Sequence, residues 1–333
     1  MIVLFLTNAV AAQIGVPFMN PDDVKPDLSI PANIPLVTGC NSSGIGCPYD
    51  NLPILYIPVN FHYYLNLDGT GNFNEINDGS SPPNPYNGYQ RAEDIVKEAN
   101  SQLETNDPIF GPNPNNSPSC KINIRLVLGG VYFHRVSNKG TCFDSLETKS
   151  LYGPIWNKYE VNPKKEFNVN LQTYTNACPV NYAINKDKGP SGVTPGYGDY
   201  RLGVFNDWDA YQYWKGSEGL QGYPLANNAK TLLHELVHTV GLFHPTKGGD
   251  ECDDTYKFKK DCWDKKDTDP DCDKWGKVSN NLMDYNQFTN WSLTACQVCF
   301  IYEAFSGKGG YNQSGLVRRI GGCPPANAFV SLP

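Results

Sequence analysis

The 333-residue sequence has no apolar run long enough to cross a lipid bilayer and no cluster of basic residues. A membrane-spanning helix needs about 20 consecutive apolar residues, so we expect no transmembrane segment. Lysines and arginines are scattered, and the net charge is −7. Because nucleic-acid-binding surfaces are normally basic, we expect no nucleic-acid partner. Methionine and histidine are also scarce, with three and five residues, so the places where they gather are informative.

One segment, residues 234–244 with the sequence HELVHTVGLFH, contains three of the five histidines. Apolar residues in and before it recur at helical spacing, which predicts a helix with one buried face. His234 and His238 stand four residues apart, so both imidazoles project from the same face of that helix. Neutral imidazole binds zinc readily, so this pair is predicted to hold one metal ion.

Gly241 interrupts the helical pattern before the third histidine. A continuing helix would carry His244 up the axis and off the face that His234 and His238 share. Glycine tolerates the left-handed conformation of a helix C-cap, and Pro245 opposes a restart of the helix. We therefore expect the backbone to reverse at this point and to direct His244 toward the same ion.

Three histidines form a catalytic type of zinc site, with one position left for water. Glu235 is placed to take a proton from that water, which predicts hydrolytic chemistry. The alternative is that these histidines are ordinary helix and loop residues. The helix-breaking Gly241 and the position of the third histidine, His244, argue against such a chance match. His62 and His134 stand alone in apolar, strand-like runs, where packing or surface positions are expected.

The segment resembles the signature of the metzincin zinc peptidases, HExxHxxGxxH followed by a methionine turn. About forty residues downstream stands the matching stretch 281–285, NLMDY. The resemblance implies that Met283 forms an apolar floor beneath the metal without binding it. It also implies that Tyr285 lies near the metal, where it can help to stabilise the transition state. Core filling for Met283 and an ordinary aromatic position for Tyr285 are the alternatives.

Within the metzincin clan, the turn and the cysteine- and aspartate-rich insert before it look most like the pappalysin family. The resemblance implies an α+β fold. Its upper subdomain, about 51–241, would hold a twisted, mixed five-stranded sheet with two helices. Its lower subdomain, about 242–333, would be irregular and disulfide-bonded, with the methionine turn and a C-terminal helix. The catalytic domain would therefore span 51–333. It would follow a possible signal remnant at 1–12 and an irregular extension or short pro-segment at 13–50.

Apolar periodicity also predicts elements outside the histidine segment. Pro53 and Pro58 suggest that the first strand is irregular or lies at a sheet edge. The expected strands are 52–66, 122–128 and 167–171, with candidates for the last two near 181–185 and 202–205, and the expected helices are 89–104 and 293–305.

Eleven cysteines indicate disulfides and an oxidising compartment, so we expect a secreted or periplasmic protein. Cys40 or Cys47 could occupy the open zinc position as an inhibitory thiol, as in some secreted metallopeptidases. The alternative, which we favour, is a small Cys40–Cys47 disulfide loop. Cys296 and Cys299 form a CxxC pair, which we expect to form structural disulfides with cysteines of the insert.

The insert at 250–273 contains nine aspartates around three cysteines. Carboxylates clustered on a constrained loop suit calcium, which binds six to eight oxygens. The spacing does not match an EF-hand, so a solvated acidic surface is the alternative.

The sequence thus predicts a secreted zinc endopeptidase that hydrolyses a protein or peptide substrate with a zinc-bound water activated by Glu235. Two alternatives stay open. One is a non-catalytic, calcium-dependent secreted binding module, and the other is a zinc hydrolase that acts on a non-peptide substrate. The presence of Glu235 argues against the binding module, because a site without catalytic activity has no chemical need for that carboxylate.

Overall fold

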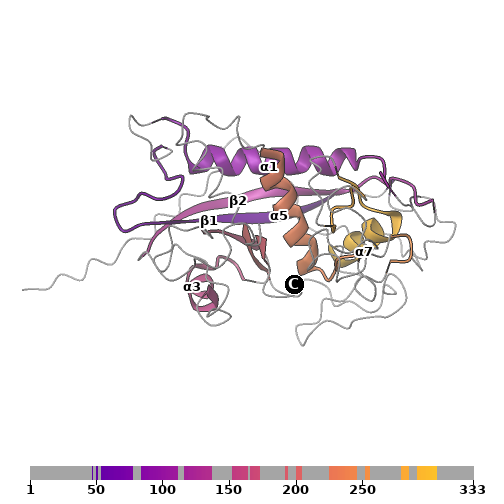
Figure 1. The fold of residues 1–333 in the computed structure, drawn as a ribbon. Helices are drawn as coiled ribbons and strands as arrows, with labels where there is room; N and C mark the ends of the chain where they lie inside the picture. The colour runs from indigo at the N-terminus through magenta and orange to yellow at the C-terminus, as the bar shows by residue number, and fades with distance from the viewer. Residues whose placement is uncertain are drawn as a thin grey trace, which may run out of the picture.

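The structure, a computed structural model, combines helices with a mixed sheet (Figure 1). It describes residues 47, 50–51, 54–77, 84–111, 116–136, 152–163, 166–172, 192–193, 200–204, 225–245, 252–255, 279–284 and 291–305. In chain order the elements are β1 Leu55–Leu65, α1 Gly88–Thr105, β2 Ile124–Arg135, α3 Tyr152–Tyr159, β3 Phe167–Leu171, β4 Gly192–Val193, β5 Arg201–Val204, α5 Leu225–Thr239 and α7 Ala295–Phe305.

The strands are arranged in the order β2-β1-β3-β5-β4. β2, β1, β3 and β5 run parallel, and the two-residue β4 pairs antiparallel with β5. The predicted strands at 167–171 and near 202–205 are confirmed as β3 and β5. The candidate near 181–185 lies outside the described residues. The coarse prediction of a mixed sheet with helices is therefore confirmed.

The prediction that the first strand is irregular is confirmed, because its register with β2 shifts between Val59 and Asn60. The alternative, an edge position, is wrong, because β1 lies between β2 and β3. The reason lies in the direction of the backbone groups around Pro58. Leu55 donates its N–H to Asn123 on the β2 side, and successive residues of a strand point alternately to opposite sides. The nitrogen of Pro58 therefore points away from β2, where pairing with β3 begins only at Val59. The missing N–H of this proline costs no ladder hydrogen bond.

The second strand is longer than predicted, because β2 continues through two glycines to Arg135. The register with β1 shifts there, from Val59 opposite Leu128 to Asn60 opposite Gly130, which leaves Gly129 as a bulge. A Cβ atom at Gly129 would stand 2.8 Å from Asn60 Oδ1. A side chain at this position would therefore require Asn60 to shift. Gly129 ends the apolar alternation without ending the strand.

Helices α1 and α5 pack together, with α1 against β2 and α5 against β5, and Figure 1 shows α1 running along the sheet. The predicted helix at 89–104 is confirmed as α1, which begins with a capping box of Asn87 and Gln90. Its Ile95 and Ala99 are buried at 1% and 0% exposure, and Phe61 of β1 is at 0%. Removing such side chains from water stabilises the fold by about 1.5–3 kcal/mol for each large one.

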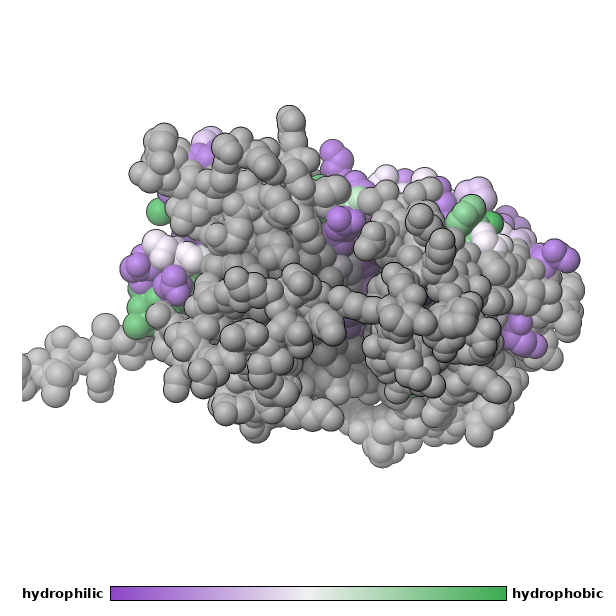
Figure 2. Space-filling view, viewed as in Figure 1, coloured by the Kyte–Doolittle hydropathy of each residue, from purple (hydrophilic) through white to green (hydrophobic). Residues whose placement is uncertain are grey.

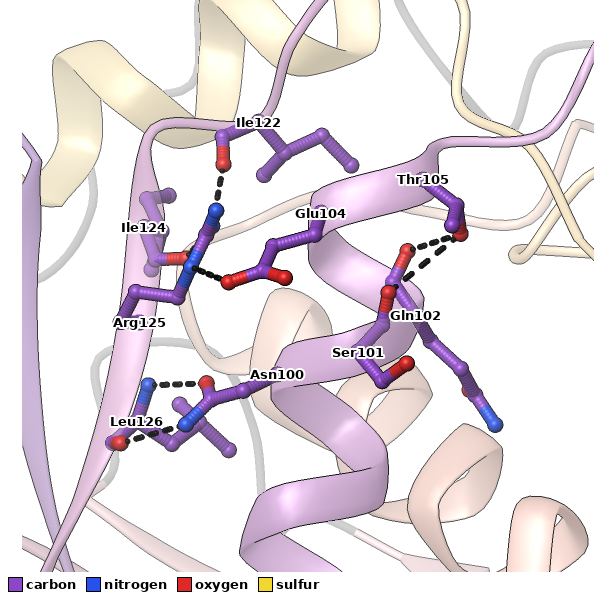
Figure 3. A network of polar contacts seen from close by, with 9 residues as sticks. All are labelled: Asn100, Ser101, Gln102, Glu104, Thr105, Ile122, Ile124, Arg125 and Leu126. Carbon is purple, nitrogen blue, oxygen red and sulfur yellow. Dashed lines mark hydrogen bonds and ion pairs between the residues drawn. The ribbon is translucent and has the colours of Figure 1, made fainter.

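The amide of Asn100 on α1 also hydrogen-bonds the backbone of the edge strand β2 (Figure 3). Asn100 Nδ2 donates to the Leu126 carbonyl at 2.9 Å, and the Leu126 N–H donates to Asn100 Oδ1 at 2.7 Å. Nearby, Arg125 donates to the carbonyls of Ile122 and Ile124 and forms an ion pair with Glu104 at 3.1 Å. Asn100 thus takes the place of a neighbouring strand and closes this part of the edge.

The opposite face of the sheet carries a buried polar layer beneath α3, a helix that the periodicity did not predict. His62 and His134 are 0% and 4% exposed and hydrogen-bond each other at 2.9 Å, so they are packing residues. Asn168 Oδ1 accepts from the backbone N–H of Val161 and also contacts His62 Nε2 at 2.9 Å. The amide oxygen must accept both bonds, so His62 Nε2 carries the proton and His62 Nδ1 accepts from His134.

Disulfides join Cys47 to Cys120 and Cys252 to Cys296. The predicted Cys40–Cys47 loop is therefore wrong, and Cys47 has no thiol that could block a metal. Cys40 itself lies outside the described residues. The second bond confirms the expected link between the insert and the CxxC pair, whose Cys299 is also disulfide-bonded. The expected stretch at 293–305 is confirmed as α7.

Among the coloured residues in Figure 2, hydrophilic ones lie in several places and hydrophobic ones form small patches. Among the described helices, none has the length and apolar character that a membrane span requires. Within the described ranges, the large hydrophobic side chains with substantial exposure are Ile54, Tyr56, Leu67, Ile76 and Phe110.

Candidate metal centre

Helix α5 presents two of the three predicted histidine ligands. Leu232 and Leu236 of its apolar stripe are 0% and 2% exposed. That buried stripe fixes the rotation of the helix and leaves His234 and His238 together on a half-buried face. The prediction of a helix ending before Gly241 is confirmed, because α5 ends at Thr239.

The chain reverses at Gly241, which has a φ of +94°. Gly241 donates its N–H to the His238 carbonyl at 3.0 Å, and Leu242 donates to the Val237 carbonyl at 3.1 Å. These two bonds form a Schellman motif, which glycine permits because it lacks a Cβ atom. The reversal returns His244 to the other two histidines, as the sequence predicts.

The three imidazoles converge through the same atom. Each pair of Nε2 atoms among His234, His238 and His244 is 3.1 Å apart. Nitrogens at 2.0–2.1 Å from a tetrahedral zinc ion stand about 3.3 Å from one another. The triangle of nitrogens therefore has the size that one metal ion requires.

Backbone carbonyls fix the tautomers of two of these rings. His234 Nδ1 lies 2.7 Å from the Leu282 carbonyl, and His238 Nδ1 lies 2.6 Å from the Leu242 carbonyl. A carbonyl only accepts, so both Nδ1 atoms carry protons and both Nε2 atoms present lone pairs. Two lone pairs at 3.1 Å repel each other, and a cation between them removes the repulsion. The donor set thus fits a metal ion.

Burial keeps the three imidazoles uncharged. Desolvation lowers the pKa of His238 to about 4 and of His244 to about 3, and it lowers that of His234 well below 6.5. All three are therefore neutral at pH 7, which is the form that binds metal. Burial also raises the pKa of Glu235 to about 8. Its carboxyl group holds a proton at neutral pH without a metal, and a nearby cation would favour the carboxylate.

Met283 follows directly after the residue whose carbonyl binds His234. It is 0% exposed, in a turn in which Asp284 donates its N–H to the Asn281 carbonyl at 3.0 Å. The structure thus brings the predicted methionine turn against His234. Tyr285 lies outside the described residues. The roles of the Leu242 and Leu282 carbonyls were not predicted, because every residue type has a backbone carbonyl.

Two other groups of potential ligands occur among the described residues, Cys47–Asp50–Cys120 and Cys252–Asp254–Cys296. In each group the two cysteines form a disulfide, so neither offers a thiolate. In the described part of the chain, the three histidines are therefore the group that can bind a metal through all its members.

The described part of the aspartate-rich insert is residues 252–255. Asp254 is 1% exposed and accepts hydrogen bonds from Ser117 Oγ, Thr294 Oγ1 and the Cys296 N–H at 2.7–3.1 Å. It thus secures the start of α7. The other predicted calcium-binding positions, apart from Asp253, lie outside the described residues.

Comparison of the chain with protein-family models finds no match, and comparison with curated proteins finds no significant match either.

Proposed function

We propose that this protein is a secreted zinc-dependent endopeptidase of the metzincin type, most similar to the pappalysin family. The observation that carries the proposal is the triangle of Nε2 atoms 3.1 Å apart, with Glu235 next to His234 in sequence. The mixed sheet backed by α1 and α5 supports the fold that the resemblance implies. The Cys47–Cys120 and Cys252–Cys296 disulfides support an oxidising compartment.

His234, His238 and His244 would hold the zinc ion in this function. When bound, zinc polarises a substrate carbonyl and makes a water molecule more acidic. Glu235 accepts a proton from the attacking water and passes it to the leaving amine. The buried position of its carboxyl group suits this task, since it raises the affinity of Glu235 for the proton. Tyr285, by its resemblance to the metzincin position, helps to stabilise the transition state.

The test is hydrolysis of casein or gelatin by the purified chain, with and without a zinc chelator and after zinc is restored. We expect zinc-dependent cleavage. Glu235→Gln should keep its zinc and lose activity by about 10²–10⁴-fold, the usual contribution of a general base. Glu104→Gln is a matched control, because Glu104 is an exposed carboxylate paired with Arg125, and it should retain full activity.

Full activity of Glu235→Gln, or activity that persists after the metal is removed, would contradict the mechanism. Zinc uptake without cleavage of any protein would instead indicate a hydrolase for a non-peptide substrate. Absence of zinc together with calcium-dependent binding would indicate a binding module.

A further inference from the structure

The peptide group between Leu282 and Met283 is hydrogen-bonded on both sides. Its carbonyl oxygen lies 2.7 Å from His234 Nδ1, and its N–H donates to Asn281 Oδ1 at 2.9 Å. Leu282 and Met283 are both 0% exposed, so water does not compete for either group. The side chain of Asn281 therefore helps to set the plane of the peptide that orients the first histidine ligand.

Asn281 is in turn held by Gln297 on α7. Asn281 Nδ2 donates to Gln297 Oε1 at 2.7 Å, and Gln297 Nε2 donates back to Asn281 Oδ1 at 3.3 Å. The two side chains are 8% and 0% exposed. A rotation of either amide group would lose both bonds in a place where replacements from water are scarce.

Gln297 is fixed to the first turn of α7 by a capping box. Its backbone N–H donates to Thr294 Oγ1 at 3.3 Å, and its Oε1 accepts the Thr294 N–H at 3.1 Å. A backbone N–H can only donate, so the oxygen of Gln297 must face Thr294 and Asn281, and its amide nitrogen must face Asn281 Oδ1. The arrangement has one hydrogen-bonding solution.

We propose that Asn281 and Gln297 are positioning residues for His234. They act through the Leu282–Met283 peptide and hold α7 in register with the metal ligands on α5. Partners of ligand histidines fix the ring and raise its basicity. A chain of hydrogen-bonded amides also polarises each member, which strengthens the carbonyl as an acceptor. The inference rests on the proposed zinc site, and it adds residues of α7 to that site's support.

The test compares zinc affinity of the full chain with and without this support. Asn281→Ala and Gln297→Met remove the two amides in turn. Gln172→Met is the matched control, because Gln172 is equally buried, at 1%, but accepts from Trp156 Nε1 beneath the other face of the sheet. Competition with a chromogenic chelator should give zinc dissociation constants about tenfold larger for both test variants. Loss of the hydrogen-bond partner of a ligand typically lowers metal affinity about 10–100-fold. The control should stay within about twofold of the unmodified protein.

A second measurement needs no metal and no activity. In the metal-free protein, the His234 Nδ1–H proton should exchange with water markedly faster in Asn281→Ala and Gln297→Met than in the control, as followed by ¹⁵N NMR. Thermal unfolding of each variant verifies that it folds, and either test variant alone suffices. Unchanged exchange and unchanged zinc affinity in a folded variant would overturn the inference. If the unmodified protein took up no zinc, the proposed function would fall, and the exchange measurement would still decide the positioning role.

Discussion

The buried, uncharged state of His62 makes the stability of the fold depend on pH. Desolvation lowers the pKa of His62 from 6.5 to about 4, although the Asn168 hydrogen bond acts in the opposite direction. Between these two values the unfolded chain binds a proton at this residue and the folded chain does not. The contribution of neutral His62 to stability is therefore fully present above pH 6.5 and is lost as the pH falls toward 4. The difference of about 2.5 pKa units corresponds to about 3 kcal/mol.

The hydrogen-bonding pattern gives the physical reason. His62 donates from Nε2 to Asn168 and accepts at Nδ1 from His134. A second proton on His62 would sit on Nδ1 and would face the N–H of His134 instead of a hydrogen-bond acceptor. His134 has its own pKa lowered, first by burial and then by His62 and Lys158. A positive charge on either histidine would thus be buried, and no carboxylate is among the described groups that shift either pKa. Such a charge therefore disfavours the folded state.

Urea unfolding between pH 4 and 7.5 measures the effect in the unmodified protein and in His62→Gln, both with chelator. The free energy of unfolding of the variant should be lower at pH 7.5 and should fall less on acidification. The difference in free energy of unfolding between the two proteins should shrink by about 3 kcal/mol from pH 7.5 to pH 4. The other histidines and the carboxylates titrate in both proteins, so they do not contribute to this change. Parallel pH profiles for the two proteins would refute this account of the buried pair.

Three further predictions concern the metal centre and its surroundings. Gly241→Ala should destabilise the protein by about 1–2 kcal/mol in urea unfolding, since alanine is strained at positive φ. It should also weaken zinc binding by moving His244. Unchanged stability and unchanged zinc affinity would contradict the role of the chain reversal. Replacing Cys252 and Cys296 by serine should cost about 4 kcal/mol by the chain-entropy estimate for a separation of 44 residues, and equal urea midpoints would oppose it. His238→Ala should lose zinc by elemental analysis, so undiminished zinc would count against this ligand.

The parts of the fold that local sequence could predict are those fixed by local contacts. Helix α1 follows from its apolar spacing, and β3 follows from its alternation. The histidine segment is the clearest case, because a helix, a glycine C-cap and a turn are all decided within about a dozen residues. The convergence of His244 on the other two histidines was predictable for this reason.

The parts that escaped prediction depend on partners far along the chain. The Cys47–Cys120 disulfide joins residues 73 positions apart, and no local spacing indicates that pairing. The central position of β1 depends on where β3 begins to pair. The carbonyl of Leu282 reaches His234 across 48 residues, and a carbonyl is common to every residue type. The amide pair of Asn281 and Gln297 was hidden for the same reason, since each amide alone is unremarkable in sequence.

The most direct test of the central claim is anomalous scattering at the zinc absorption edge from crystals of the zinc-treated protein. The account predicts one strong peak within about 2.0–2.1 Å of the Nε2 atoms of His234, His238 and His244. A structure with no peak at that position, or with the Nε2 atom of His244 turned away from the other two, would contradict it.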